Sequence, residues 1–169
     1  MKHVVIGLLD PSQASQNLGD SIIADSVQLE LREMFPLAEI RTFPTQKPWS
    51  NKDWRASRGV DFFIFGGSNV LAHNFPLNFQ WNITPAAFFR LRGNIHLMGV
   101  GRWQDGDFIS FSKYIWKQLL TGGIHAVRDS ATKSALAHLH IPSTNTSCPT
   151  TWRLQDSYKF SAQDKVVTT

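Results

Sequence analysis

The sequence is poor in cysteine and has no long apolar run. Its 169 residues include one cysteine, Cys148, so no disulfide can form within the chain, and a reducing compartment is the expected setting. The first apolar run, residues 4–9, ends at Asp10 and is too short for a signal peptide or a membrane span. These absences predict a cytoplasmic protein without a transmembrane segment.

Signatures of metal and nucleotide sites are also missing. The histidines show no metal-ligand spacing, and His138 and His140 point to different faces of a predicted helix. Gly99-Val100-Gly101 lacks the third glycine of a dinucleotide fingerprint, because position 104 is glutamine. The sequence has no Gly-x-Ser-x-Gly motif, which forms the nucleophile elbow of many serine hydrolases. We therefore expect no metal and no NAD or other cofactor.

The basic residues are scattered. Residues 1–85 carry seven Lys/Arg and eight Asp/Glu, whereas residues 86–169 carry ten and five, so the net charge of +4 comes from the second half. Such a balance attracts anionic partners in general. Nucleic acid is not an expected partner, because no binding motif and no focused basic stripe is present.

Short apolar runs alternate with segments of helical spacing. Strands are predicted at residues 4–9, 39–43, 61–65, 95–98 and 124–127, and helices at residues 20–35, 85–91, 107–120 and 130–140. Asp20 or Ser21 is expected to cap the first helix. Residues 44–59 are predicted to be a loop or a ragged helix, and residues 70–85 a long loop. The alternation predicts an α/β fold with a mostly parallel sheet and helices on both faces.

Polar segments follow three of the predicted strands. Because the carboxyl ends of parallel strands meet at one edge of a sheet, we expect these segments to converge on one cleft. The candidate binding residues are Asn17, Gly19, Asp20, Gly66, Gly67, Ser68, Asn69, Arg128 and Asp129.

Each of these motifs has a structural alternative. Asn17 and Asp20 are suited to bond a substrate hydroxyl, with Asp20 as the candidate catalytic base, but an aspartate that opens a helix also serves as an N-cap. The paired glycines offer backbone N–H groups to phosphate or carboxylate oxygens, or simply form a tight turn. Arg128 can grip such an anion; alternatively, Asp129 caps the next helix and Arg128 pairs with a neighbouring carboxylate.

Taken in order, the motifs resemble the polysaccharide pyruvyl transferase family. The matching segments are Asn17-x-Gly19-Asp20 with Ile22-Ile23, Asp61 to Asn69, Gly99-Val100-Gly101, Val127 to Ser130, and Cys148-Pro149-Thr150. The family transfers the enolpyruvyl part of phosphoenolpyruvate to a sugar, which forms a pyruvate ketal and releases phosphate. The resemblance implies a role in the synthesis of cell-surface polysaccharide.

Family members resemble two-lobed GT-B glycosyltransferases, so the resemblance implies that residues 1–160 form a Rossmann-like amino-terminal lobe. Residues 161–169 would begin a second lobe, or add an edge strand to the first. The family's Arg and His contacts to phosphoenolpyruvate lie mainly in the second lobe. The resemblance therefore implies that the donor site lies mostly outside this chain, that the chain alone is inactive, and that an exposed docking face promotes self-association into a homo-oligomer.

On the acceptor side, the resemblance implies that Asn17, Gly19 and Asp20 line the cleft and that Asp20 takes the proton of the sugar hydroxyl. Trp81 and Trp103 are candidates to stack on a sugar face, with core packing as the alternative. The other function that stays open is a non-catalytic α/β module that binds a glycan or a partner protein.

Overall fold

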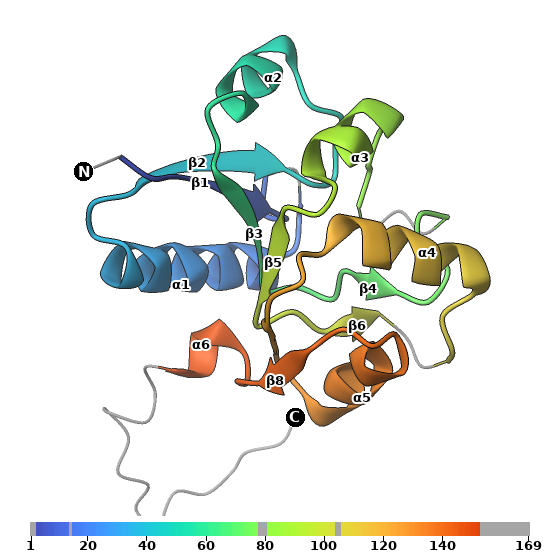
Figure 1. Ribbon diagram of the computed structural model, residues 1–169. Helices are drawn as coiled ribbons and strands as arrows, with labels where there is room; N and C mark the ends of the chain where they lie inside the picture. The colour runs from blue at the N-terminus through green and yellow to red at the C-terminus, as the bar shows by residue number, and fades with distance from the viewer. Residues whose placement is uncertain (1–2, 14, 78–80, 104–105, 153–169) are drawn as a thin grey trace, which may run out of the picture.

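A computed structural model describes residues 3–13, 15–77, 81–103 and 106–152 (Figure 1). Its central sheet has four parallel strands in the order β2-β1-β3-β5. These strands are β1 (Val5–Asp10), β2 (Glu39–Pro44), β3 (Phe62–Gly66) and β5 (Ile95–Met98). The chain moves outward from β1 to β2 and returns to the other side of β1 with β3, so the strand order reverses between β1 and β3. The predicted α/β class with a parallel, Rossmann-like sheet is confirmed.

Two short strand pairs extend this arrangement. They are β7 (His125–Val127) with β8 (Ser143–Asn145), and β4 (Leu71–Ala72) with β6 (Arg102–Trp103). β7 lies beside β5, because the Gly99 N–H donates to the Ala126 carbonyl at 3.0 Å and the Arg128 N–H donates to the Val100 carbonyl at 3.0 Å. Every strand pair in the described part of the chain is parallel.

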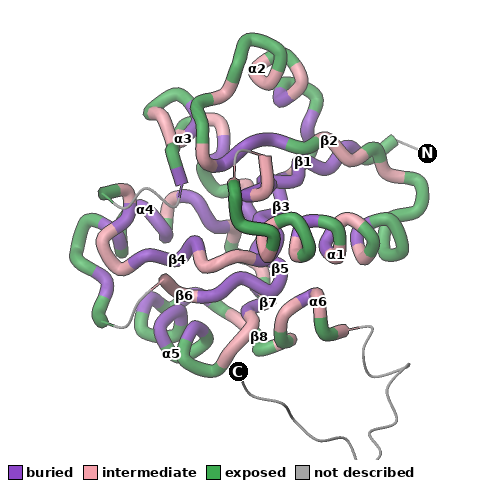
Figure 2. The backbone as a smooth tube through the Cα atoms, turned by 180° about the vertical axis from the view of Figure 1, so that it is seen from behind, coloured by how far each residue is buried: buried purple, intermediate pink, exposed green. Residues whose placement is uncertain are grey.

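Helices cover both faces of the sheet, as predicted (Figure 1). On one face, Ile6 and Leu8 of β1 pack against α1 (Leu18–Met34), and α6 (Pro149–Trp152) lies beside it. On the other face, Leu9 belongs to a larger core. Its helices are α2 (Asn51–Ser57), α3 (Pro85–Leu91), α4 (Ser110–Leu119) and α5 (Ser130–His138). β1 is buried along its whole length and β3 is buried except at Phe62, whereas the outer turns of the helices are exposed (Figure 2).

An aromatic stack fills part of the larger core. Phe75 stacks on Trp116 with ring centroids 4.6 Å apart and on Trp81 with centroids 5.5 Å apart. Trp81 is 3% exposed. Trp81 is therefore a core residue, and its suggested role in stacking on a sugar is wrong.

Several boundaries differ from the sequence prediction. α1 begins at Leu18 and is capped by Asn17 rather than by Asp20 or Ser21. The short strands β4 and β8 were not predicted, because two or three residues carry no periodic signal. Residues 161–169, predicted to begin a lobe or form an edge strand, lie outside the described residues.

Within the described residues, no helix combines the length and the apolar content that crossing a bilayer requires.

Candidate functional site

A polar hollow of about 390 Å³ lies where the strand order reverses. In open α/β sheets this is the crevice in which ligands bind, because the loops that leave neighbouring strands diverge there. We call it the switch-point hollow. It is lined by Ser15, Asn17, Gly19, Asp20, Ile23, Gln46, Ser68, Asn69, Trp103 and Arg128. Six of the nine candidate binding residues thus meet at one site.

The first wall of the switch-point hollow is the start of α1. The Asn17 side chain accepts a hydrogen bond from the Gly19 N–H at 3.0 Å, which caps the helix. Ser15 accepts from the Asn17 N–H at 3.1 Å and donates its hydroxyl to the Asp20 carboxylate at 2.6 Å. Asp20 is half-buried and held in place by Ser15, so one carboxylate faces the hollow in a fixed position.

The second wall is the loop after β3. Ser68 has a φ of 64°, in the left-handed region that is strained for a residue with a side chain, and its carbonyl accepts from the Gly101 N–H at 2.9 Å. Asn69 Oδ1 is buried and has no hydrogen-bond partner among the described residues. An unpaired buried acceptor costs free energy, and a ligand donor placed beside it would recover that cost.

Gly66 and Gly67 do not line the switch-point hollow. A Cβ at Gly66 would lie 2.4 Å from Val27, and one at Gly67 would lie 1.9 Å from Ile23. The Gly67 N–H already donates to the Met98 carbonyl at 2.8 Å. Both glycines therefore let α1 approach the sheet closely, and the structure gives them packing roles in place of the predicted anion cradle.

Arg128 and Asn69 approach each other over Gly101. A Cβ at Gly101 would lie 2.3 Å from Arg128 Nε and 2.5 Å from Asn69 Oδ1. The absence of a side chain at Gly101 thus creates the space that both polar groups occupy. The motif Gly99-Val100-Gly101 did not predict this role, because it does not show which side chains lie over Gly101.

Asp129 is not among the residues that line the switch-point hollow. Its carboxylate accepts from the Thr132 N–H at 2.7 Å and so caps α5, and it lies 3.5 Å from Arg128 Nε. Burial raises the pKa of Asp129, but the hydrogen bonds from Thr132 and the charge of Arg128 outweigh it, and the net shift is below the ordinary value. Asp129 therefore serves as a helix cap, which was the alternative interpretation of this residue. Arg128 also reaches the hollow.

Three lining residues were not among the predicted site residues: Ser15, Ile23 and Gln46. Ser15 lies in the same β1–α1 loop as Asn17, so its position after a buried strand was the available signal. Gln46 follows β2, and the polar residues after this strand were not predicted to form part of a site. Trp103, suggested as a surface for stacking on a sugar, does line the hollow.

In the part of the chain that the structure describes, no three histidine, cysteine or carboxylate side chains gather in a way that could hold a metal ion. The lining of the switch-point hollow supplies a half-buried carboxylate, an amide oxygen, hydroxyl groups, an indole and one guanidinium. This set suits a neutral ligand rich in hydroxyl groups, because each hydroxyl both donates and accepts.

Comparison with protein families gives a match over most of the chain. A family model described as polysaccharide pyruvyl transferase matches residues 17–167, which is most of the chain and includes every candidate binding residue. The search of curated proteins and the search of solved structures gave no match.

Proposed function

This chain belongs to the polysaccharide pyruvyl transferase family, and from that premise we propose that the switch-point hollow binds the sugar acceptor of a pyruvyl transfer reaction. The family supports a transferase role toward a sugar acceptor. The observation that carries the proposal is the convergence on one polar hollow of Asp20 from the first turn of α1, Asn69 from the loop after β3 and Arg128 from the segment after β7. Phosphoenolpyruvate is the proposed donor, and a pyruvate ketal in a cell-surface polysaccharide is the proposed product.

Ketal formation makes clear demands on such a site. Two sugar hydroxyl oxygens bond to the central carbon of the enolpyruvyl group, and the bond from that carbon to the phosphate oxygen breaks. The two hydroxyl groups lose two protons in total. The methylene carbon gains one proton and becomes a methyl group, and the second proton leaves with phosphate. A carboxylate within reach of a hydroxyl can act as the base for this transfer.

We assign the role of base to Asp20. Its carboxylate is half-buried, faces the hollow and is oriented by the Ser15 hydroxyl at 2.6 Å. Asn69 Oδ1 is suited to accept a hydrogen bond from a second sugar hydroxyl, and the Trp103 ring offers an apolar surface for the C–H face of a sugar.

The hollow is poorly suited to hold phosphoenolpyruvate by itself. Arg128 is the one cation among its lining residues, and the Asp129 carboxylate lies 3.5 Å from it. A donor with a phosphate and a carboxylate needs more positive charge than this. We therefore propose that the hollow forms the acceptor side and that other groups of the active enzyme bind the donor phosphate. The cytoplasm remains the predicted location, because the chain's lone cysteine, Cys148, suits a reducing compartment.

Binding of the acceptor can be measured by NMR titration of the chain with a panel of methyl glycosides. We expect at least one glycoside to shift the indole N–H signal of Trp103, while the signal of the buried Trp81 stays in place as an internal control. Phosphoenolpyruvate alone should leave both signals unchanged. If no glycoside moves the Trp103 signal, the hollow is not an acceptor site.

Catalysis is tested on the complete gene product by phosphate release from phosphoenolpyruvate in the presence of the glycoside that binds. The Asp20→Asn variant should still bind the glycoside but lose phosphate release, because an amide cannot take the proton. Glycoside binding without any phosphate release would instead establish the non-catalytic binding module and overturn the transferase proposal.

A further inference from the structure

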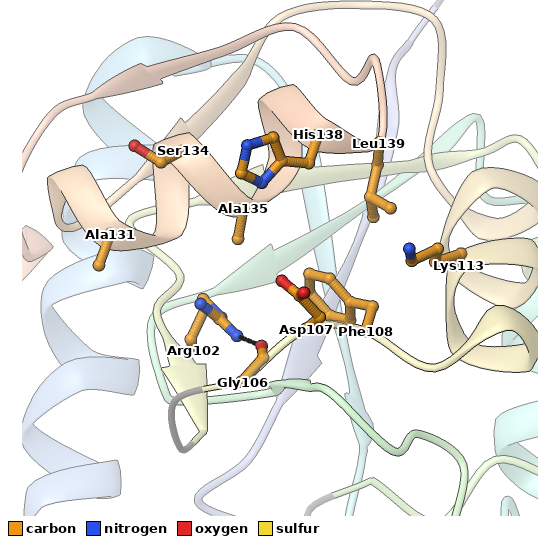
Figure 3. A pocket seen from close by; sticks show the side chains of 10 residues that line it. All are labelled: Arg102, Gly106, Asp107, Phe108, Lys113, Ala131, Ser134, Ala135, His138 and Leu139. Atoms are coloured by element: carbon orange, nitrogen blue, oxygen red, sulfur yellow. Dashed lines mark hydrogen bonds between the residues drawn. The ribbon is translucent and has the colours of Figure 1, made fainter.

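A second hollow of about 310 Å³ lies between α4, α5 and the segment that follows β6 (Figure 3). We call it the α5 hollow. It shares no lining residue with the switch-point hollow. Consecutive residues of β6 face the two sites, since Arg102 lines the α5 hollow and Trp103 lines the switch-point hollow. The proposed sugar-acceptor site therefore leaves the α5 hollow unexplained.

Two contacts orient the Arg102 guanidinium in the α5 hollow. Its Nη2 donates to the Gly106 carbonyl, and its Cζ lies 5.4 Å from the centre of the buried Phe108 ring (Figure 3). The Arg102 backbone N–H donates to the buried Thr132 hydroxyl at 3.1 Å, which ties β6 to α5. Arg102 Nε is buried without a hydrogen-bond partner among the described residues. An oriented guanidinium with an unused donor is the preorganised half of an anion site.

Further polar groups surround Arg102. The Lys113 side chain comes from α4 and the His138 ring from α5, and both lie on the side of the hollow opposite Arg102 (Figure 3). The Asp107 carboxylate lies between Arg102 and that opposite side. The ion pairs found in the described part of the chain join Glu39 to His3 and Arg41, and Arg128 to Asp129. Neither Arg102 nor Lys113 is paired there with a carboxylate, so both cations remain available to an anionic ligand.

The remaining lining is apolar apart from Ser134 and the backbone of Gly106. Ala131 and Ala135 of α5 leave the space open, and Phe108 and Leu139 supply larger apolar surfaces. A ligand that suits all of these groups carries an anion for Arg102 and Lys113, hydroxyl donors for Asp107, and a C–H face for the apolar walls. We propose that the α5 hollow is a binding site for a phosphorylated sugar.

The test is an NMR titration of the full chain with glucose 1-phosphate, with inorganic phosphate and glucose titrated separately. We expect glucose 1-phosphate to shift the amide signals of Gly106, Phe108 and Ala135, inorganic phosphate to shift them with lower affinity, and glucose to leave them unchanged. The Trp103 indole signal should not respond. This result does not depend on the acceptor proposal, which rests on a different signal and on neutral glycosides.

Two pairs of variants test separately the charge of the α5 hollow and the space inside it. Lys113→Gln removes an exposed charge of the hollow, and we expect it to weaken glucose 1-phosphate binding by about three- to tenfold, whereas Lys133→Gln, on α5 but outside the lining, should not. Ala131→Leu should abolish binding by filling the hollow without changing its charge, while Ala137→Leu places the same side chain on an exposed position of α5 outside the lining.

Four results would overturn the proposal. The first is the absence of any shift with glucose 1-phosphate. The second is equal weakening by Lys113→Gln and Lys133→Gln, which would show attraction to general surface charge. The third is unchanged binding in Ala131→Leu, which would place the ligand elsewhere. Binding of inorganic phosphate as tight as that of glucose 1-phosphate would also reject the sugar as part of the ligand.

Discussion

The two hollows lie on either side of β6 and are built from different parts of the fold. The switch-point hollow is made mainly of loops that leave parallel strands, and its one cation, Arg128, has the Asp129 carboxylate 3.5 Å away. The α5 hollow is walled largely by helices, and Arg102 and Lys113 have no carboxylate partner among the described residues.

Under the two proposals, this difference separates two kinds of ligand. Hydroxyls, an amide oxygen and a compensated cation recognise a neutral ligand through directional hydrogen bonds. Two cations that form no ion pair among the described residues, beside one carboxylate and apolar walls, favour an anion instead. The comparison is tested by changes that affect one hollow and leave the other intact.

The largest expected effect is at Gly101. In Gly101→Ala the new Cβ would lie 2.3 Å from Arg128 Nε and 2.5 Å from Asn69 Oδ1, so both side chains must leave their positions. Glycoside binding at the switch-point hollow should fall more than about tenfold, whereas stability should fall by only about 1–3 kcal/mol because side chains give way more easily than backbone. Titration and urea unfolding measure the two effects.

The matched control for this change is Gly122→Ala, since a Cβ at Gly122 would meet no atom within 4 Å. Binding of glucose 1-phosphate to the α5 hollow should be unchanged in both variants. Equal loss of both ligands in Gly101→Ala would mean that the two hollows are one site.

A smaller effect is expected from Asn69→Ala. This variant removes a hydrogen-bond acceptor that has no partner among the described residues, so the folded protein loses little. Glycoside affinity should fall by about five- to tenfold, as for one hydrogen bond of about 1 kcal/mol. Thermal unfolding should be nearly unchanged, and a large drop in the unfolding temperature would instead make Asn69 a structural residue.

The switch-point hollow was largely predictable from the sequence. Asp20, Asn69 and Arg128 each lie near the end of a recognisable strand or the start of the following helix, and parallel strands bring such positions together at one edge. The residues next to a glycine in the sequence were less informative about whether that glycine binds a ligand or allows close packing. Gly67 looked like part of an anion-binding loop, but its φ of 61° and its contact with Ile23 serve the packing of α1.

The α5 hollow was not predictable in the same way. Arg102, Lys113 and His138 lie on β6, α4 and α5, and no sequence spacing connects them. They meet because the two helices pack against β6, and Thr132 accepts a hydrogen bond from the Arg102 backbone. Sites built from helix faces depend on tertiary packing, whereas sites at strand ends follow from the topology of the sheet.

Both hollows exist only in the folded chain, so their comparison is limited to the pH range in which the chain stays folded. Two histidines are expected to determine how the stability of the fold decreases at low pH. His125 is fully buried; its Nδ1 accepts from the Leu97 N–H at 3.2 Å, and its Nε2 lies 3.2 Å from the Thr121 carbonyl. Burial lowers the pKa of His125, and the nearby His96 lowers it further; burial also lowers the pKa of His96.

The unfolded chain therefore binds protons more readily than the folded chain. The free energy of unfolding should be fully retained above the ordinary histidine pKa of 6.5 and should decrease as the pH falls below it. Asp129 contributes only at more acidic pH, since its pKa is lowered from 3.8. Urea unfolding between neutral pH and about pH 5 isolates the histidine effect. The decrease should be reduced in His125→Gln but kept in the matched His138→Gln, and a stability that does not change over this range would contradict the assignment.

The smallest expected effect is that of salt, and it distinguishes the two hollows without any mutation. Raising the ionic strength from about 0.01 M to about 0.15 M shortens the Debye length from about 30 Å to about 8 Å. Lys113 is exposed, so its attraction for glucose 1-phosphate is screened, and the affinity of the α5 hollow should fall by about two- to fivefold. The affinity of the switch-point hollow for a neutral glycoside should not change, because hydrogen bonds to uncharged hydroxyls are hardly screened. A salt-dependent glycoside affinity, or a salt-independent affinity for glucose 1-phosphate, would show that charge does not separate the two hollows.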